Sequence, residues 1–248
     1  MHYLDENFSR INLKFSSDLV NAGIDFFWLL ERGYNRKVAL DAVTARWHLS
    51  RVERVALYRT VFDSVTSFMR RRKLKECKGD MLAIDGFNVL STVQSALIGD
   101  TLLHASDGFV RDLATTIRKV RISPLLYTSL YVLLMYVYKI VQPGKLIIVF
   151  DSQVSRSGEF ALLVERLLKK LGLEGKALTN ASADNYLIRL HEEYAIATSD
   201  SVLIDRADVV DDLGGRVASL VAKERIIELG EAILGGVRKI AKDLAERI

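Results

Sequence analysis

The stretch Met81–Leu90, MLAIDGFNVL, decides the expected fold. Its first half is an apolar run that ends at Asp85, and Gly86 follows at once. This pattern predicts a buried strand that ends in a carboxylate. In an open α/β sheet, ligands bind beyond the carboxyl ends of the strands, so Asp85 is a candidate site residue.

Two later stretches end in the same way. The run 145–150, KLIIVF, leads into Asp151, and the run 194–198, YAIAT, leads into Ser199 and Asp200. Three acidic strand ends in one parallel sheet would place several carboxylates close together, and like charges at that spacing need a cation to stay ionised. The sequence therefore predicts a divalent metal site at this edge of the sheet.

From residue 81 onward, expected strands alternate with expected helices, which indicates an α/β fold with a mostly parallel sheet flanked by helices. The predicted strands are 81–85, 145–150, 175–178, 194–198 and 207–210. The predicted helices are 88–98, 124–140, 159–172 and 183–192. Residues 216–248 predict an amphipathic helix with a break at Gly235 and Gly236. Its apolar side would close the sheet, dock on the first domain or pair with a second chain in a homodimer.

The first 78 residues predict a small all-helical domain. Apolar residues at helical spacing cover 17–32, and a second helix is expected over 36–47. Ser50 and Glu53 form a capping-box signature for a third helix that extends to Phe68. The turn before Ser50 and the arginines after it resemble a helix-turn-helix, while a helical module that packs on the second domain accounts for the same pattern.

Charge is uneven along the chain. Residues 1–80 hold 15 basic and 10 acidic residues, a net charge of +5, whereas residues 81–248 hold 20 and 21, a net charge of −1. The change falls at Met69–Lys78, MRRRKLKECK, which we take as the boundary between domains 1–78 and 79–248. This run either forms a solvated helix end or tracks the phosphates of a nucleic acid. The candidates for such a patch are Arg70, Arg71, Arg72 and Lys73.

Composition excludes several classes of protein. The single cysteine, Cys77, excludes an internal disulfide framework, and the four histidines lack the spacing of a structural zinc site. The first twenty residues are charged and have no apolar centre, so we expect no signal peptide and a cytoplasmic location. The apolar stretch Leu125–Val141 is short for a membrane span and contains Lys139, so we expect a buried helix.

Four motifs in order, IDGFNVL, VFDS, SADNYLI and ATSDS, resemble the PIN-like nucleases and, among them, the NYN branch. In that group the first strand ends in D-G-x-N, a later strand ends in F-D, a helix opens with A-D, and another strand ends in T-S-D. The resemblance covers about residues 81–211. Together with the helical N-terminal region, it also resembles an uncharacterised prokaryotic family of unknown function.

The resemblance implies a metal-dependent nuclease. It places Asp85, Asp151, Asp184 and Asp200 around one or two Mg²⁺ or Mn²⁺ ions, and it implies that Asn88 orients the first carboxylate or a phosphate. The implied catalytic residues are Asp85, Asn88, Asp151 and Asp200. Carboxylates without His or Cys suit these hard cations, which activate water and steady the leaving oxygen in phosphodiester hydrolysis. Asp184 and Asp200 could also have a structural role, since each can cap a helix.

Two further segments supply additional candidates. PIN nucleases usually take an acidic ligand from a helix between the first and second strand carboxylates, and Asp112, in the expected loop 104–113, is the candidate nearest to that place in the chain. Asp205 would support Asp200 or cap a turn. The loop 152–158, SQVSRSG, predicts an anion site at a helix start, and a polar capping loop accounts for it equally. The residues expected to contact a substrate phosphate are Arg111, Ser155, Arg156 and Ser157.

The expected partner is RNA in the first place and DNA in the second. The core has a net charge of −1, so the N-terminal part at +5 would supply the long-range attraction for a polyanion. The competing hypothesis is a non-catalytic module that binds RNA, DNA or a protein, with a structural ion or none. Convergence of Asp85, Asp151 and Asp200 on one point would favour the nuclease.

Overall fold

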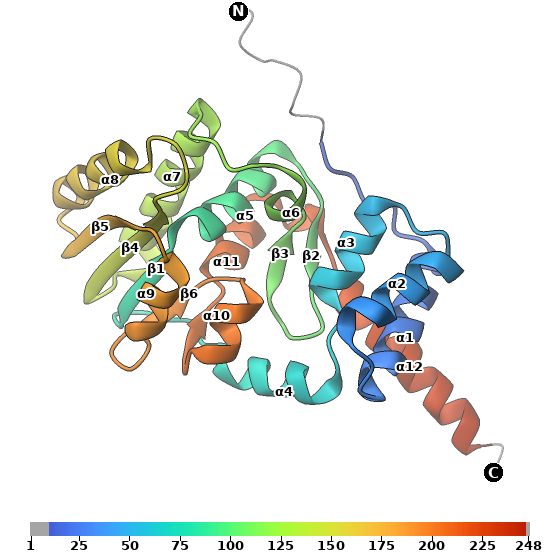
Figure 1. Cartoon of the computed structure of the whole chain (residues 1–248). Helices are drawn as coiled ribbons and strands as arrows, with labels where there is room; N and C mark the ends of the chain where they lie inside the picture. Colours follow the sequence, from blue (N-terminus) through green and yellow to red (C-terminus); the bar gives the residue numbers. More distant parts are fainter. Residues whose placement is uncertain (1–9, 247–248) are drawn as a thin grey trace, which may run out of the picture.

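The computed structural model describes residues 10–246 (Figure 1), so the first nine residues and the predicted helix end at Ile248 lie outside the described residues. A five-stranded parallel sheet has the order β5-β4-β1-β6-β7. Its strands are β1 (Met81–Asp85), β4 (Lys145–Asp151), β5 (Gly175–Asn180), β6 (Ala195–Ala197) and β7 (Val210–Asp211). The predicted α/β class with a parallel sheet is confirmed.

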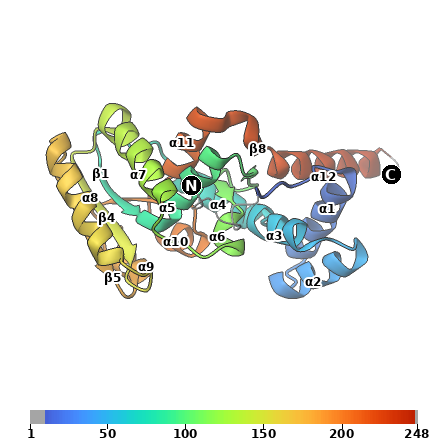
Figure 2. The same ribbon diagram turned by 90° about the horizontal axis from the view of Figure 1, so that it is seen from above.

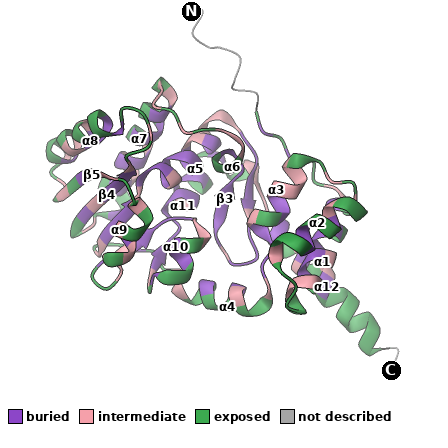
Figure 3. Cartoon of the chain, viewed as in Figure 1, coloured by how far each residue is buried: buried purple, intermediate pink, exposed green. Residues whose placement is uncertain are grey.

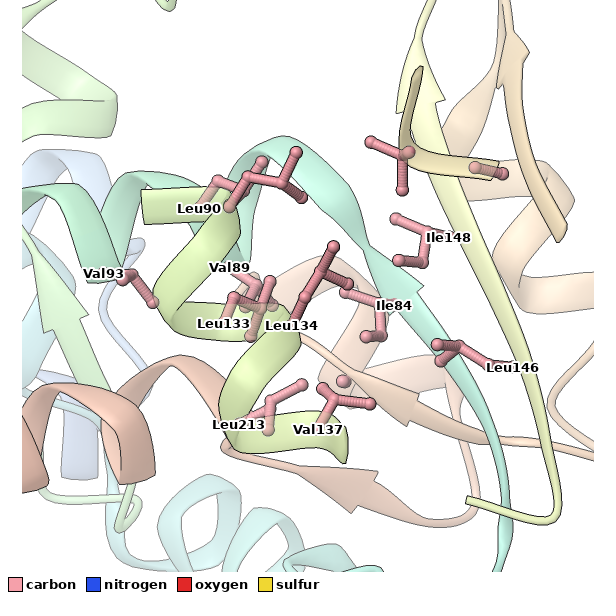
Figure 4. Packing of buried hydrophobic residues seen from close by; sticks show 14 of the residues in the cluster. Ile84, Val89, Leu90, Val93, Leu133, Leu134, Val137, Leu146, Ile148 and Leu213 are labelled. Carbon is pink, nitrogen blue, oxygen red and sulfur yellow. The ribbon is translucent and has the colours of Figure 1, made fainter. Parts of the chain in front are cut away.

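Side chains alternate across the central strand β1. Leu82 and Ile84 face one layer of helices, and Ala83 faces the other, so both sides of the strand are buried. The first layer contains α5 (Gly86–Ile98), α7 (Pro124–Tyr136), α8 (Ser157–Leu171) and α11 (Leu213–Ala222). The second contains α9 (Ala183–Arg189) and α10 (Ser201–Arg206). Figure 4 shows Ile84 and Ile148 packed in the first layer.

The apolar helix α7 belongs to this core. With the π-helical turn Val137–Val141, it is the one helix among the described residues that is long and apolar enough to cross a membrane. Its residues Leu130, Leu133 and Leu134 are buried in the same core as β1 and β4. Figure 4 shows Leu133 and Leu134 in this core. The helix thus contributes side chains to the core of the α/β domain.

Four helices precede the sheet: α1 (Ser17–Glu31), α2 (Arg36–Arg46), α3 (Arg51–Thr60) and α4 (Ser64–Lys73). Ser50 and Glu53 form the predicted capping box at the start of α3. The predicted extension of this helix to Phe68 is wrong, because the Asp63 side chain accepts the Thr66 N–H and starts α4 as a separate helix. An N-terminal helical region is confirmed.

The predicted C-terminal helix is also divided, at a different place from the one expected. After α11 come a 3₁₀ turn (Lys223–Arg225), strand β8 (Ile226–Ile227) and α12 (Leu229–Ala245). Gly235 and Gly236 lie inside α12, so the predicted break there is wrong. A Cβ on Gly236 would lie 2.4 Å from Cδ1 of Ile24, so this glycine permits close contact between α12 and α1.

Helix α12 docks on the N-terminal helices, one of its three expected positions. Leu229 and Ile233 from α12 and Leu103 from β2 share a buried core with α1–α3. The predicted units 1–78 and 79–248 therefore have side chains in a common core. From above, α1, α2 and α12 lie at one end of the molecule and β4, β5 and α8 at the other (Figure 2).

A second sheet lies between these ends, with strand order β3-β2-β8. Strands β2 (Leu102–His104) and β3 (Val110–Asp112) form an antiparallel hairpin, and the short helix α6 (Ala114–Ile117) follows. The expectation of a loop over 104–113 is therefore wrong at residue 104 and at residues 110–112, since strands of three residues are too short to show a clear alternation. Figure 3 shows β3 as buried.

Candidate functional site

The polar strand ends meet where the strand order changes direction. The chain builds β1, β4 and β5 outward on one side, and β6 and β7 then continue on the other side of β1. Ligand crevices form at such a switch point, beyond the carboxyl ends of the strands. Asp85 pairs in register with Val149, and Ile84 with Ala197, so the residues after β1, β4 and β6 reach the same edge.

Asp85 and Asn88 are bonded to the turn after β6. Thr198 Oγ1 donates a 2.9 Å hydrogen bond to Oδ2 of Asp85. Asn88 Oδ1 accepts from the backbone N–H of Ser199 at 2.9 Å and from its hydroxyl at 3.1 Å. The N–H of Asp200 donates to Thr198 Oγ1 at 3.1 Å. These bonds fix the end of β1 and the Thr198–Asp200 turn as one unit.

Gly86 allows helix α5 to begin directly after Asp85. A Cβ at this position would lie 2.3 Å from Cε1 of Phe150 and 2.9 Å from the carbonyl oxygen of Val149. Any other residue would therefore displace β4. This close approach is the physical reason for glycine after the strand, and it places Asn88 in the first turn of α5.

The other three expected ligands come from separate elements. Asp151 ends β4 and accepts the N–H of Gln153 at 2.8 Å. Asp184 lies in the first turn of α9, where the structure has no side-chain cap. Asp200 caps α10, because its Oδ1 accepts the N–H of Val202 at 2.8 Å. The expected capping role thus holds for Asp200 and does not hold for Asp184.

The charges of these acids affect one another's protonation. Desolvation, together with the charges of Asp184 and Asp200, raises the pKa of Asp85 to about 7, against the lowering effect of the Thr198 hydrogen bond. Desolvation and the charges of Asp200 and Asp151 raise the pKa of Asp184. The cluster holds more carboxylates than can easily ionise together without a cation.

The donor set suits a hard, hydrated cation. It consists of carboxylates, whereas Zn²⁺ sites usually include nitrogen or sulfur ligands. Within residues 10–246, no three Asp, Glu, His or Cys side chains form a group that could hold a metal ion. Mg²⁺ is commonly bound through one or two carboxylates and keeps several waters. The residues therefore fit an ion of that kind, and they do not fit an ion enclosed by protein ligands.

Asp112 and Asp205, the expected additional ligands, have protein partners instead. Asp112 is fully buried and accepts hydrogen bonds from the hydroxyls of Thr92 at 3.1 Å and Thr115 at 2.8 Å. Asp205 forms a two-pronged ion pair with Arg70 at 2.7 and 2.8 Å. The contacts of Asp112 join β3 to α5 and α6, and those of Asp205 join α10 to α4. These protein contacts occupy Asp112 in place of the metal role expected of it, and they tie Asp205 to Arg70.

Arg111 does not offer its donors to a substrate phosphate. Its side chain is 2% exposed, and Nη1 and Nη2 donate to Asp107 at 2.6 and 2.8 Å. Its Nε donates to the carbonyl oxygen of Ser199 at 3.0 Å. Arg111 therefore positions the turn that carries Asp200, in place of the direct phosphate contact that the sequence suggested.

The loop before α8 provides no side-chain cap for the helix, so the capping alternative does not hold in the form expected. Arg156 has a left-handed backbone at the N-cap and pairs with Glu159 at 2.8 Å, and both side chains are exposed. Ser155 is exposed and Ser157 is buried. The Arg156 guanidinium is therefore bound to its own helix.

Most side chains of the basic run 70–73 bind other parts of the protein and so fix the position of α4. Arg70 is 5% exposed and pairs with Asp107 and Asp205, so it does not belong to an exposed patch. Arg71 donates to the carbonyl of Ser106 and pairs with Glu231, and Lys73 donates to the carbonyls of Ile204 and Asp205. Arg72 is exposed and lies over the ring of Phe68. Figure 1 shows α4 crossing from the N-terminal helices to α10.

Sequence reasoning missed the residues that support the acids. Thr198 and Ser199 were noted only as the end of a strand, although the tripeptide TSD carried their signal. Asp107, the buried partner of both Arg70 and Arg111, had no signal, because its partners lie on β3 and α4 and only the fold brings them together.

Comparisons with known proteins identify a family but no activity. The chain belongs to the family described as "Domain of unknown function (DUF5616)", whose model matches residues 74–216. The model "Protein of unknown function (DUF434)" matches residues 18–73. The "Uncharacterized protein MJ0935" of Methanocaldococcus jannaschii is 32% identical over 190 residues, which cover 75% of this chain and 88% of that protein. No solved structure matches the chain significantly.

Proposed function

We propose that this protein is a metal-dependent ribonuclease that hydrolyses phosphodiester bonds with Mg²⁺ or Mn²⁺. The observation that carries the proposal is the environment of Asp85. This carboxylate ends the central strand at the switch point, and its pKa is raised by removal from water and by the neighbouring acids Asp184 and Asp200. The resemblance to PIN-like nucleases of the NYN branch supports the same chemistry.

Each residue of the site has a proposed task. Asp85, Asp151, Asp184 and Asp200 would hold one or two hydrated ions, each through one or two carboxylates, and a bound ion would neutralise charge on the phosphodiester. Thr198 orients Asp85 through its hydroxyl. Asn88 fixes the turn before Asp200 through Ser199, so it acts by positioning.

The proposed substrate is RNA ahead of DNA, and the proposed location is the cytoplasm. The net charge of +5 on residues 1–80 supports an anionic partner for the helical part. A reducing compartment suits Cys77, which is buried and free.

A second candidate is a binding module without catalysis. The observation that favours it is the lack, within the described residues, of three side chains grouped to hold one metal. In that case the carboxylates hold a structural ion or none, and the protein cleaves no nucleic acid in any metal.

The test is a cleavage screen with pooled RNAs and single-stranded DNAs in Mg²⁺, in Mn²⁺ and in chelator. Wild type is compared with Asp85→Asn, which keeps the shape of the side chain, and with Asp243→Asn, an exposed residue of α12. We expect metal-dependent cleavage of RNA by wild type and Asp243→Asn, and none by Asp85→Asn at equal RNA affinity. Absence of cleavage by wild type in every metal supports the binding module, and equal cleavage by all three proteins removes Asp85 from the site.

A further inference from the structure

A cavity of about 510 Å³ lies between the N-terminal helices and the carboxylate site. Four arginines from four different elements line it, and Ser199 and Asp200 from the turn after β6 line it as well. We call this cavity the arginine pocket and define it by Arg36, Arg59, Arg70 and Arg111. It is adjacent to the proposed metal site, since Asp200 belongs to both.

Two of these arginines are neutralised within the protein. Arg70 pairs with Asp107 and Asp205, and Arg111 pairs with Asp107. The ring of Phe62 lies 4.2 Å from the Arg70 guanidinium and 5.1 Å from that of Arg111. These two side chains form the fixed wall of the arginine pocket.

The other two arginines have no carboxylate partner among residues 10–246. Arg36 donates to the carbonyl oxygen of Tyr58, and Arg59 makes one 3.4 Å contact to the Thr116 hydroxyl. Nε and Nη2 of Arg59 are covered from solvent and have no acceptor in the described part of the chain. These two donors form the edge of a guanidinium that binds an oxyanion with two parallel hydrogen bonds.

Acidic side chains also line the cavity, but they accept hydrogen bonds from backbone N–H groups at the starts of helices. Asp63 accepts the N–H of Thr66 at 2.8 Å, and Asp200 accepts that of Val202 at 2.8 Å.

Burial lowers the pKa of Arg36 to about 10, and burial also lowers the pKa of Arg59. Both arginines are partly buried. Arg36 lies 4.4 Å from the ring centre of Phe62, and the charges of Asp112 and Asp200 favour the charged form of Arg59. Neither arginine, however, forms an ion pair among residues 10–246. A desolvated cation without a paired anion is costly, so these two arginines favour binding of an anion in the cavity.

Two tyrosines extend the arginine pocket toward solvent. Tyr34 is 54% exposed and Tyr58 is 49% exposed, and both line the cavity. The Arg36 guanidinium lies 5.0 Å from the ring centre of Tyr58. A small inorganic anion would leave these rings without a role, whereas the bases of an unpaired strand stack on aromatic side chains of this kind.

We propose that the arginine pocket binds a phosphate of a single-stranded nucleic acid on Arg36 and Arg59, with an adjoining base against Tyr34 or Tyr58. The N-terminal helices would thus hold the strand beside Asp200. Binding of the strand needs neither metal nor cleavage. The proposal therefore rests on the proposed function only in treating the bound strand as a substrate.

The experiment measures fluorescence anisotropy of a labelled oligouridylate of about 12 nucleotides with the full chain in chelator. The variants are Arg36→Gln, Arg59→Gln and Tyr58→Leu, and the matched control is Arg166→Gln, an exposed arginine of α8. We expect each pocket variant to weaken binding about 10-fold, from loss of a charge-assisted hydrogen bond or of stacking, and the control to bind as wild type. Arg59→Lys keeps the charge without the two-pronged edge, so it should recover only part of the affinity.

A second measurement separates a binding role from a structural one. Inorganic phosphate and uridine monophosphate should raise the melting temperature of wild type and Arg166→Gln. Neither should raise that of Arg59→Gln as far, and Tyr58→Leu should lose part of the effect of the nucleotide only. If Arg59→Gln does not fold, Arg36→Gln and Tyr58→Leu provide the same comparisons.

The outcomes distinguish this proposal from the nuclease. Equal strand affinity in wild type and all pocket variants overturns the arginine pocket, even where Asp85→Asn abolishes cleavage. Weaker binding by the pocket variants together with no cleavage by wild type supports the pocket and contradicts the nuclease. A duplex RNA that competes as well as the single strand overturns the role of the tyrosines.

Discussion

The hydroxyl of Thr198 donates a 2.9 Å hydrogen bond to the carboxylate of Asp85, and the two residues lie 113 positions apart in the chain. Asp85 ends β1, and Thr198 directly follows the neighbouring parallel strand β6, at the point where the strand order changes direction. The bond lowers the pKa of Asp85, while desolvation and two nearby acids raise it. Thr198 therefore orients the central acid and favours its ionised form.

Thr198→Val should lower the rate of RNA cleavage about 10- to 100-fold, as the loss of a residue that supports a metal ligand commonly does. Without this donor the pKa of Asp85 rises further, so the acid limb of the pH–rate profile should move to higher pH. Strand affinity in chelator should stay the same. Thr128→Val, at an exposed hydroxyl of α7, is the control, and equal rates in both variants would contradict the role of Thr198.

Stability of the metal-free protein should fall as pH rises. The pKa of Asp85 goes from an ordinary 3.8 to about 7 on folding, so the folded state binds more protons between these values. The contribution of Asp85 to the free energy of unfolding is thus fully present below about pH 4 and is lost by about pH 7. The loss amounts to at most about 4 kcal/mol. Urea unfolding in chelator should show a smaller loss from about pH 5 to about pH 8 in Asp85→Asn. The same loss in both proteins would show that Asp85 keeps an ordinary pKa.

Arg70→Met should destabilise the fold by about 3 to 5 kcal/mol, because it leaves Asp107 buried with half of its ion pairs. Arg72→Met, two positions along the same helix turn, should change the free energy of unfolding by less than about 0.5 kcal/mol. Urea unfolding of the two variants gives the comparison. A similar small change in both would mean that the basic run is a solvated helix end throughout.

The main sheet and the position of the carboxylates were readable from sequence. The runs that end at Asp85 and Asp151 are apolar on both faces, since β1 and β4 are covered by helices on both sides, and short apolar runs of this kind are typical of buried parallel strands. Parallel pairing then brings their ends to one edge without further information. The capping box at Ser50 was readable for a similar reason, because its two residues are only three positions apart.

The remaining features depend on contacts between distant residues. Arg70 and Asp205 are 135 positions apart, so a basic run that looked solvated proved to be partly buried. Gly236 resembled a helix breaker, although its lack of a side chain serves the contact with Ile24. The arginine pocket combines side chains from α2, α3, α4 and β3, and no local pattern in the sequence indicates a cavity between elements of this kind.

The most direct test of the proposed metal site is the binding of Mn²⁺, followed by the electron paramagnetic resonance signal of the free ion. Wild type and Asp243→Asn should each remove free Mn²⁺ from solution. Asp85→Asn should bind the ion at least about 10-fold more weakly, because it removes one carboxylate from the cluster that attracts the cation. No uptake of Mn²⁺ by wild type, or equal uptake by wild type and Asp85→Asn, would contradict a metal site at the ends of these strands.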